Sequence, residues 1–127
     1  MADHGDKERL RDLSEVVMGM LVYLQHMLHD LPIPVVIPPI LGEAGPNHDA
    51  IFALDRARDL IEDEPLAEQL RTAYGMLILE WFTAYELIVI RQMAGPAPWR
   101  LDAAQLAIDR FSTVVEAIED GGLGDQS

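Results

Sequence analysis

Residues 76–90 read MLILEWFTAYELIVI, an apolar run interrupted by two carboxylates, Glu80 and Glu86. Pro65 before the run and Gly95-Pro96 after it are typical of the start and the end of a helix. The sequence therefore predicts a helix over 65–94, about 45 Å long at 1.5 Å per residue. A helix that is apolar on more than one side needs cover on those sides, either from other helices of the chain or from a second copy.

Three further segments repeat apolar residues at helical spacing, and we expect helices over about 7–30, 49–63 and 103–120. The first is clearly amphipathic, and Leu31-Pro32 ends it because the residue before a proline avoids helical angles. Asp102 resembles the start of a capping box for the last. We therefore expect the 127 residues to form one domain, 1–127, an all-α antiparallel bundle of about four helices.

A long proline-rich connection, LPIPVVIPPILGEAGPN at 31–47, joins the first two predicted helices. Its prolines forbid a regular helix, yet its aliphatic residues are too apolar for an exposed loop. Three interpretations remain open: a strap across the ends of the bundle that covers its own core, a strip that docks on a partner, or a lid over an apolar pocket. The residues that we expect at an interface or a binding surface are Val35, Val36, Ile37, Ile40, Trp81, Phe82 and Tyr85.

The net charge of −13 excludes some partners. Binding of nucleic acid or of an anionic membrane needs clustered Lys and Arg, so we expect neither. Acidity fits simple solubility, or capture of a basic protein. The chain has no cysteine, which excludes disulfides and thiolate chemistry.

Neither export nor membrane insertion is expected. The first residues, MADHGDKERLRDL, are charged where a secretory signal would be apolar, and a cytoplasmic protein is the default. The apolar run at 76–90 is shorter than the roughly 20 residues that span a bilayer. Its two glutamates would each cost about 2.5–3.5 kcal/mol near the bilayer centre.

The sequence contains no recognisable metal, cofactor or catalytic motif. His26 and His29 could share a helix face, but their arc points away from the apolar arc, so we expect surface histidines and no metal. The Glu-x-x-His pattern of di-iron bundles does not occur on two helices, and no glycine-rich phosphate loop or catalytic triad is apparent. We expect no cofactor.

The two glutamates of the apolar run differ in their helical neighbours. Six residues apart, Glu80 and Glu86 lie about 120° from one another on a helix, so they cannot form one paired site. Glu80 shares a stripe with polar and small residues and is expected at the surface. Glu86 is surrounded at helical spacing by apolar residues such as Phe82 and Ile90, and we expect it to be buried or at an interface.

Two classes of function follow. The first is a non-catalytic acidic helical protein that assembles as a homodimer or in a larger complex, or that captures a basic protein. The second is a small-molecule-binding protein or enzyme, in which a buried Glu86 acts as general acid or base in a pocket of aromatic side chains. The first is favoured, because no convergent set of polar groups accompanies Glu86.

Overall fold

The computed structural model of the chain describes residues 2–38, 41–42, 45–46, 48–95 and 97–121. Within these residues the elements are, in chain order, α1 (Ala2–His29), β1 (Leu41–Gly42), β2 (Gly45–Pro46), α2 (His48–Glu62), α3 (Glu68–Ala94) and α4 (Pro98–Glu119). The two short strands form one antiparallel pair. The predicted all-α bundle of four helices, with a long proline-rich connection between the first two, is confirmed.

Helix boundaries follow local sequence signals with a few differences. α1 starts earlier than expected, at Ala2, and α3 starts at Glu68, just beyond the proline that was expected to open it. α4 begins at Pro98. Proline suits the first helical position, because an N–H at that position would have no partner within the helix, so its absence costs nothing. Asp102 is therefore not a cap: it lies inside α4 and pairs with Arg9 of α1 at 2.7 Å.

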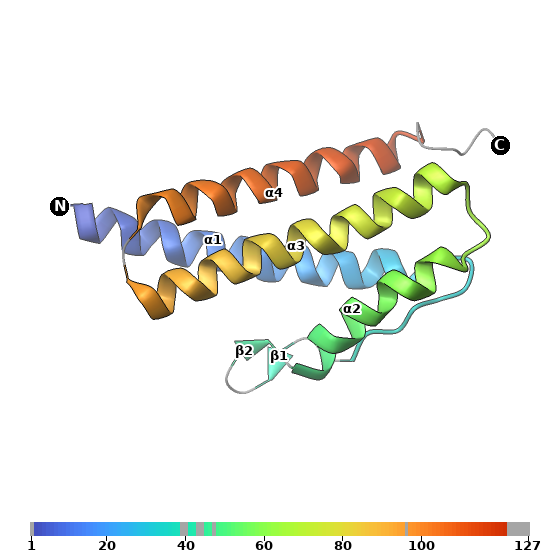
Figure 1. Ribbon diagram of the computed structural model, residues 1–127, viewed down its shortest axis with the longest axis horizontal. Helices are drawn as coiled ribbons and strands as arrows, with labels where there is room; N and C mark the ends of the chain where they lie inside the picture. Colours follow the sequence, from blue (N-terminus) through green and yellow to red (C-terminus); the bar gives the residue numbers. More distant parts are fainter. Residues whose placement is uncertain (1, 39–40, 43–44, 47, 96, 122–127) are drawn as a thin grey trace.

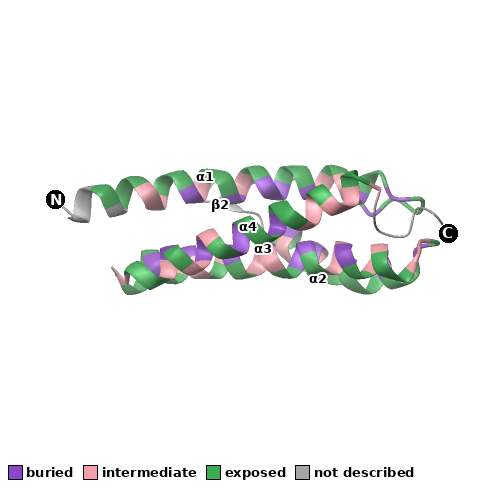
Figure 2. Cartoon of the chain, turned by 90° about the horizontal axis from the view of Figure 1, so that it is seen from above, coloured by how far each residue is buried: buried purple, intermediate pink, exposed green. Residues whose placement is uncertain are grey.

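The central helix is α3, which contacts α1, α2 and α4 (Figure 1). It runs antiparallel to all three, because the connection after α1 carries the chain back along the bundle and lets α2 run in the same direction as α1 (Figure 1). Buried and exposed positions alternate along each helix, as the amphipathic patterns predict (Figure 2).

Trp81 forms the centre of the core. Its side chain is fully buried, and its indole Nε1–H donates a hydrogen bond of 2.8 Å to the carbonyl of Val17 in α1. The pairing gives the one polar atom of the ring a partner inside an apolar core. The other large side chains of the core that are almost completely inaccessible are Leu21, Leu24, Leu28, Leu54, Ile61, Leu77, Ile78 and Leu101.

Among the described helices, α3 alone is long and apolar enough to cross a membrane by length and composition. The central helix of a bundle meets the same criterion, because it needs apolar side chains on every side that another helix covers. Only a third of its most apolar window is buried in this bundle, however. A substantial part of its apolar surface is therefore left open.

Residues 31–38 form a strap along the bundle. Val35 and Ile37 are buried while Ile33 and Val36 are exposed, which is the alternation of an extended chain with one side on a core. The N–H of Val35 donates to the carbonyl of Leu28 at 3.0 Å. This stretch covers the chain's own core, as the strap interpretation expected, but it runs along the bundle and not across its ends (Figure 1). Ile40 lies outside the described residues.

Polar contacts fix both ends of the strap. The amide of Gln25 in α1 donates to the carbonyl of Ile37 at 3.0 Å. At the other end, the buried carboxylate of Glu64, in the α2–α3 turn, accepts the N–H of Ile33 at 2.9 Å. Arg71 of α3 donates to the carbonyl of Leu66 in the same turn. Side chains of α1, α3 and the α2–α3 turn thus hold the strap and its surroundings in place.

We predict that Val35→Ala lowers the free energy of unfolding by about 1.5–2.5 kcal/mol, because it removes two buried methyl groups. Val36→Ala is the matched control, since the neighbouring side chain is 71% exposed and its loss should change stability by less than about 0.5 kcal/mol. Urea unfolding followed by circular dichroism measures both. Equal losses would contradict a strap that covers the core through alternate residues.

Tyr74 of α3 gives a second prediction, because burial raises the pKa of its hydroxyl above 10, and the negative charges of Asp30 and Glu64 raise it further. The folded state therefore holds this proton more tightly than the unfolded chain does. Its contribution to stability is complete below about pH 10 and is lost as the pH rises through the folded-state pKa. The hydroxyl of Tyr23 acts in the same range, because its hydrogen bond to Glu119 raises its pKa.

The urea midpoint should accordingly fall above about pH 10, and it should fall less steeply in Tyr74→Phe. Absorbance of tyrosinate in the folded protein gives the titration directly. A variant whose midpoint falls as steeply as that of the wild type would show that Tyr74 does not contribute.

Candidate functional site

The outer face of α3 is a stripe of exposed residues on the side that none of the described helices covers. Its members recur at alternating steps of three and four residues, which keeps them on one side of a helix. They are Met76, Leu79, Thr83, Glu86, Ile90 and Met93. The four large apolar members are between 43% and 81% exposed. An exposed apolar stripe of this kind is typical of an interaction site.

Glu86 lies on this outer face and is exposed, so its side chain is not buried within the chain, and its expected place at an interface stays a prediction. The apolar neighbours that suggested burial, among them Leu79 and Ile90, are themselves exposed. They belong to the open side of α3 and not to the core. Apolar neighbours along a helix therefore indicated a shared face, but not whether that face is covered.

Glu80 is the more enclosed of the two carboxylates, contrary to its expected place in an exposed stripe. Its side chain is only 16% exposed and accepts two hydrogen bonds from Arg110 of α4, from Nε at 2.7 Å and from Nη2 at 3.1 Å. These bonds raise the pKa of the Arg110 guanidinium above its ordinary value. The ion pair links α3 to α4, and its geometry is that of a structural contact between two helices.

A groove runs beside the outer face, between α2 and α3. Its volume is about 440 Å³, and it is lined by Ile51, Phe52 and Asp55 from α2 and by Phe82, Tyr85 and Glu86 from α3. Three of the predicted site residues, those from α3, thus meet in one place. Phe52 was not predicted: it is 67% exposed, and its position off the apolar arc of α2 was the available signal.

Trp81 lies beneath this groove and orders two of its rings. Tyr85 stacks on the indole at 4.9 Å between ring centroids with an interplanar angle of 10°, and Phe82 meets it edge-on at 5.5 Å. The indole of Trp81 is inaccessible to solvent, and Val35 and Ile37 are almost completely buried. These three predicted interface residues contribute to the chain's own core, whereas Val36 is exposed.

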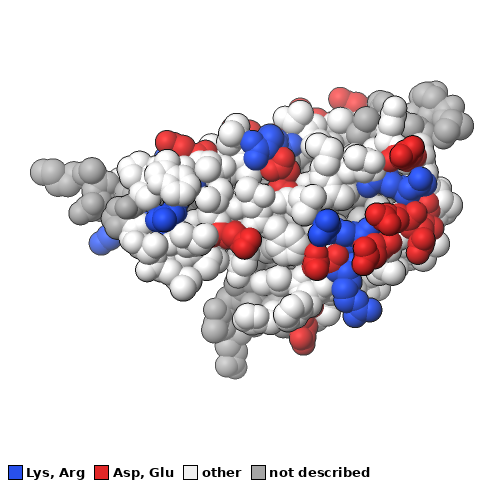
Figure 3. All heavy atoms as spheres, in the orientation of Figure 1, with Lys and Arg blue, Asp and Glu red and all other residues white. Residues whose placement is uncertain are grey.

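Charge is distributed unevenly over this side of the molecule. Acidic and basic side chains crowd at the end where α2 finishes and α3 begins, and most of the remaining surface carries few charges (Figures 1 and 3). In the groove, Asp55 pairs with Arg58 at 3.1 Å. Over the described part of the chain, no cation pairs with Glu86.

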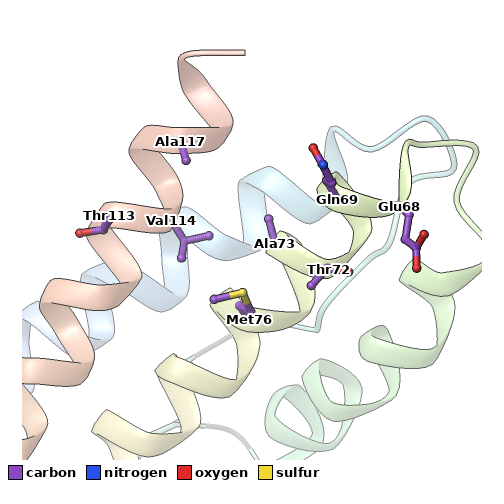
Figure 4. A pocket seen from close by; sticks show the side chains of 8 residues that line it. All are labelled: Glu68, Gln69, Thr72, Ala73, Met76, Thr113, Val114 and Ala117. Atoms are coloured by element: carbon purple, nitrogen blue, oxygen red, sulfur yellow. The ribbon is translucent and has the colours of Figure 1, made fainter. Parts of the chain in front are cut away.

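A second groove, of about 460 Å³, lies between the start of α3 and the end of α4 (Figure 4). Its lining is Glu68, Gln69, Thr72, Ala73, Met76, Thr113, Val114 and Ala117. Met76 also belongs to the outer face of α3, so this groove extends the open apolar surface of that helix. Glu68 is the single carboxylate in this lining, and it has no second titratable group beside it there for acid-base chemistry.

Metal-binding groups do not converge in the described ranges: no three His, Cys, Asp or Glu side chains lie close enough to hold an ion. His26 and His29 are both exposed, near the strap residues Val36 and Ile37. The arrangement on α2 and α3 is therefore suited to binding through apolar, aromatic and carboxylate groups.

Comparison of the chain with protein-family models, with curated proteins and with solved structures found no match.

Glu80 and Glu86, the two carboxylates of the apolar run in α3, provide a test of this description. We predict that Glu80→Gln lowers the urea midpoint, because it weakens the ion pair between α3 and α4, and that Glu86→Gln does not lower it. Each substitution removes one negative charge from the same helix, so each is the control for the other. A larger loss in Glu86→Gln would contradict the exposed position of that side chain.

Proposed function

We propose that the protein is a non-catalytic assembly protein that pairs with a second copy of itself through the outer face of α3. The observation that supports this is the exposed stripe from Met76 to Met93, which is about 26 Å long at 1.5 Å per residue. Its steps of three and four residues are those of helices that pack along one another.

The order of residues along the stripe favours a twofold pair. From either end, the stripe has two large apolar residues, then two polar residues, then two large apolar residues. Antiparallel packing about a point between residues 84 and 85 would set Met76 against Met93 of the second copy, and Leu79 against Ile90. A twofold interface needs such a self-complementary patch.

The same register would set Thr83 against Glu86 of the second copy. In the isolated chain the Thr83 hydroxyl donates to the carbonyl of Leu79 at 2.9 Å, which keeps it on α3. Rotation toward the other copy would offer that hydrogen to the carboxylate. A polar contact among apolar ones opposes registers that leave the carboxylate without a partner.

The enzyme hypothesis has one observation in its favour, since Phe82, Tyr85 and Glu86 do line a common groove. General acid-base catalysis needs a site that excludes water and further polar groups that orient a substrate. Glu86 is exposed to water, and the neighbouring carboxylate, Asp55, is already paired with Arg58. The groove therefore meets neither requirement. Assembly through the outer face is therefore the better supported function.

We predict that sedimentation equilibrium at about 100 µM protein shows a dimer, and that the dimer strengthens as salt rises from about 0.02 to 0.3 M. The direction follows from the net charge of −13 on each copy, whose repulsion salt screens. Ile90→Glu should weaken association at least about tenfold, because it buries a charge in the contact.

Val22→Glu is the matched control, because Val22 of α1 has the same exposed fraction as Ile90, 43%, and gains the same charge away from the outer face. It should leave the dimer intact. A wild-type protein that stays monomeric at the higher salt concentration, or equal weakening by both substitutions, would overturn the proposal.

A further inference from the structure

We propose that the groove between α2 and α3 is a binding site for a small organic cation of the methylated-ammonium class. Its volume of about 440 Å³ is in the range of small-molecule sites, which is roughly 300–1,000 Å³. All six lining residues come from one copy of the chain. The site is therefore complete in a monomer and does not rest on the proposed dimer.

Three aromatic side chains, Phe52, Phe82 and Tyr85, line the groove. The face of an aromatic ring attracts a cation, and several rings together are the usual receptor for an ammonium group that carries methyl groups. Contacts with the buried Trp81 already order Phe82 and Tyr85. A ligand therefore needs to immobilise little more than Phe52, which lowers the entropy cost of binding.

The carboxylates determine the sign of the ligand's charge. Glu86 has no cationic partner in the described part of the chain, while Asp55 is held by Arg58 at the rim. A cation above the rings would supply the missing countercharge, and the net charge of −13 would draw it toward the surface. An anion would meet repulsion from both carboxylates.

The apolar lining decides between kinds of cation. A primary ammonium is compact and strongly hydrated, and it would need several acceptors to replace its water. The groove offers Ile51 and three rings with carboxylates at its side, so it cannot surround such an ion with oxygens. Methyl groups on nitrogen spread the charge and provide apolar surface, which matches this lining.

The decisive experiment compares choline with 3,3-dimethylbutan-1-ol, which has the same shape but a carbon in place of the charged nitrogen. Both are titrated into the protein while its aromatic ¹H–¹³C resonances are recorded. We expect saturable shifts of the Phe82 and Tyr85 signals with choline, and binding at least about fivefold weaker with the neutral alcohol.

Two substitutions test the groups that carry the inference. Glu86→Gln should weaken choline binding about three- to fivefold, because it removes the countercharge. Phe52→Leu should weaken it by a similar factor, because it keeps an apolar side chain but removes a ring. Glu62→Gln is the control: it removes one charge from α2 outside the groove and should leave binding unchanged.

Equal affinity for choline and the alcohol would overturn the proposal, as would the absence of saturable shifts. So would a loss in Glu62→Gln as large as that in Glu86→Gln, since the effect would then be one of net charge. The titration is repeated on Ile90→Glu, whose changed side chain lies outside the groove. Binding that persists in this variant separates the cation site from self-assembly, so that either can fail alone.

Discussion

The architecture depends on the need to cover α3. This helix is apolar on more than one side, and a bundle of four helices supplies only three neighbours for it. Trp81 shows what full cover provides: the ring is inaccessible and its one polar atom bonds to a carbonyl of α1. The fourth side has no neighbouring helix among the described residues, and the outer face of α3 results from that shortage.

The strap explains why the helices are arranged as they are. A short turn after α1 would make α2 antiparallel to it, as in a simple up-and-down bundle. Residues 31–38 instead lie along the bundle with Val35 and Ile37 on the core, and the chain returns before α2 begins. α1, α2 and α4 then run in one direction against α3, and the bond from the Ile33 N–H to Glu64 ties the strap to the turn between α2 and α3.

The parts of the fold that local sequence determines could be predicted. Proline, glycine and apolar spacing placed the helices closely and identified the strap as a covered segment. Glu80 and Glu86 of α3 could not be assigned, because their burial depends on which neighbours pack around the helix. Arg110 lies on α4, thirty residues from Glu80 along the chain, and no local signal joins them. Phe52 was missed although its place off the apolar arc of α2 was visible in the sequence, because the groove that it lines exists only once α2 lies against α3.

Glu86 connects the two proposals. In the proposed dimer it lies close to the twofold axis, where two carboxylates and the large negative charge of both copies oppose association. A methylated ammonium bound in the adjoining groove would neutralise the charge of that carboxylate. The second copy would not have to supply a hydrogen-bond acceptor for the bound cation. Cation binding and pairing would then favour one another, and linkage requires that each strengthen the other by the same factor. In the two proposals taken together, Glu86 is a position where a small ligand would act on assembly through charge.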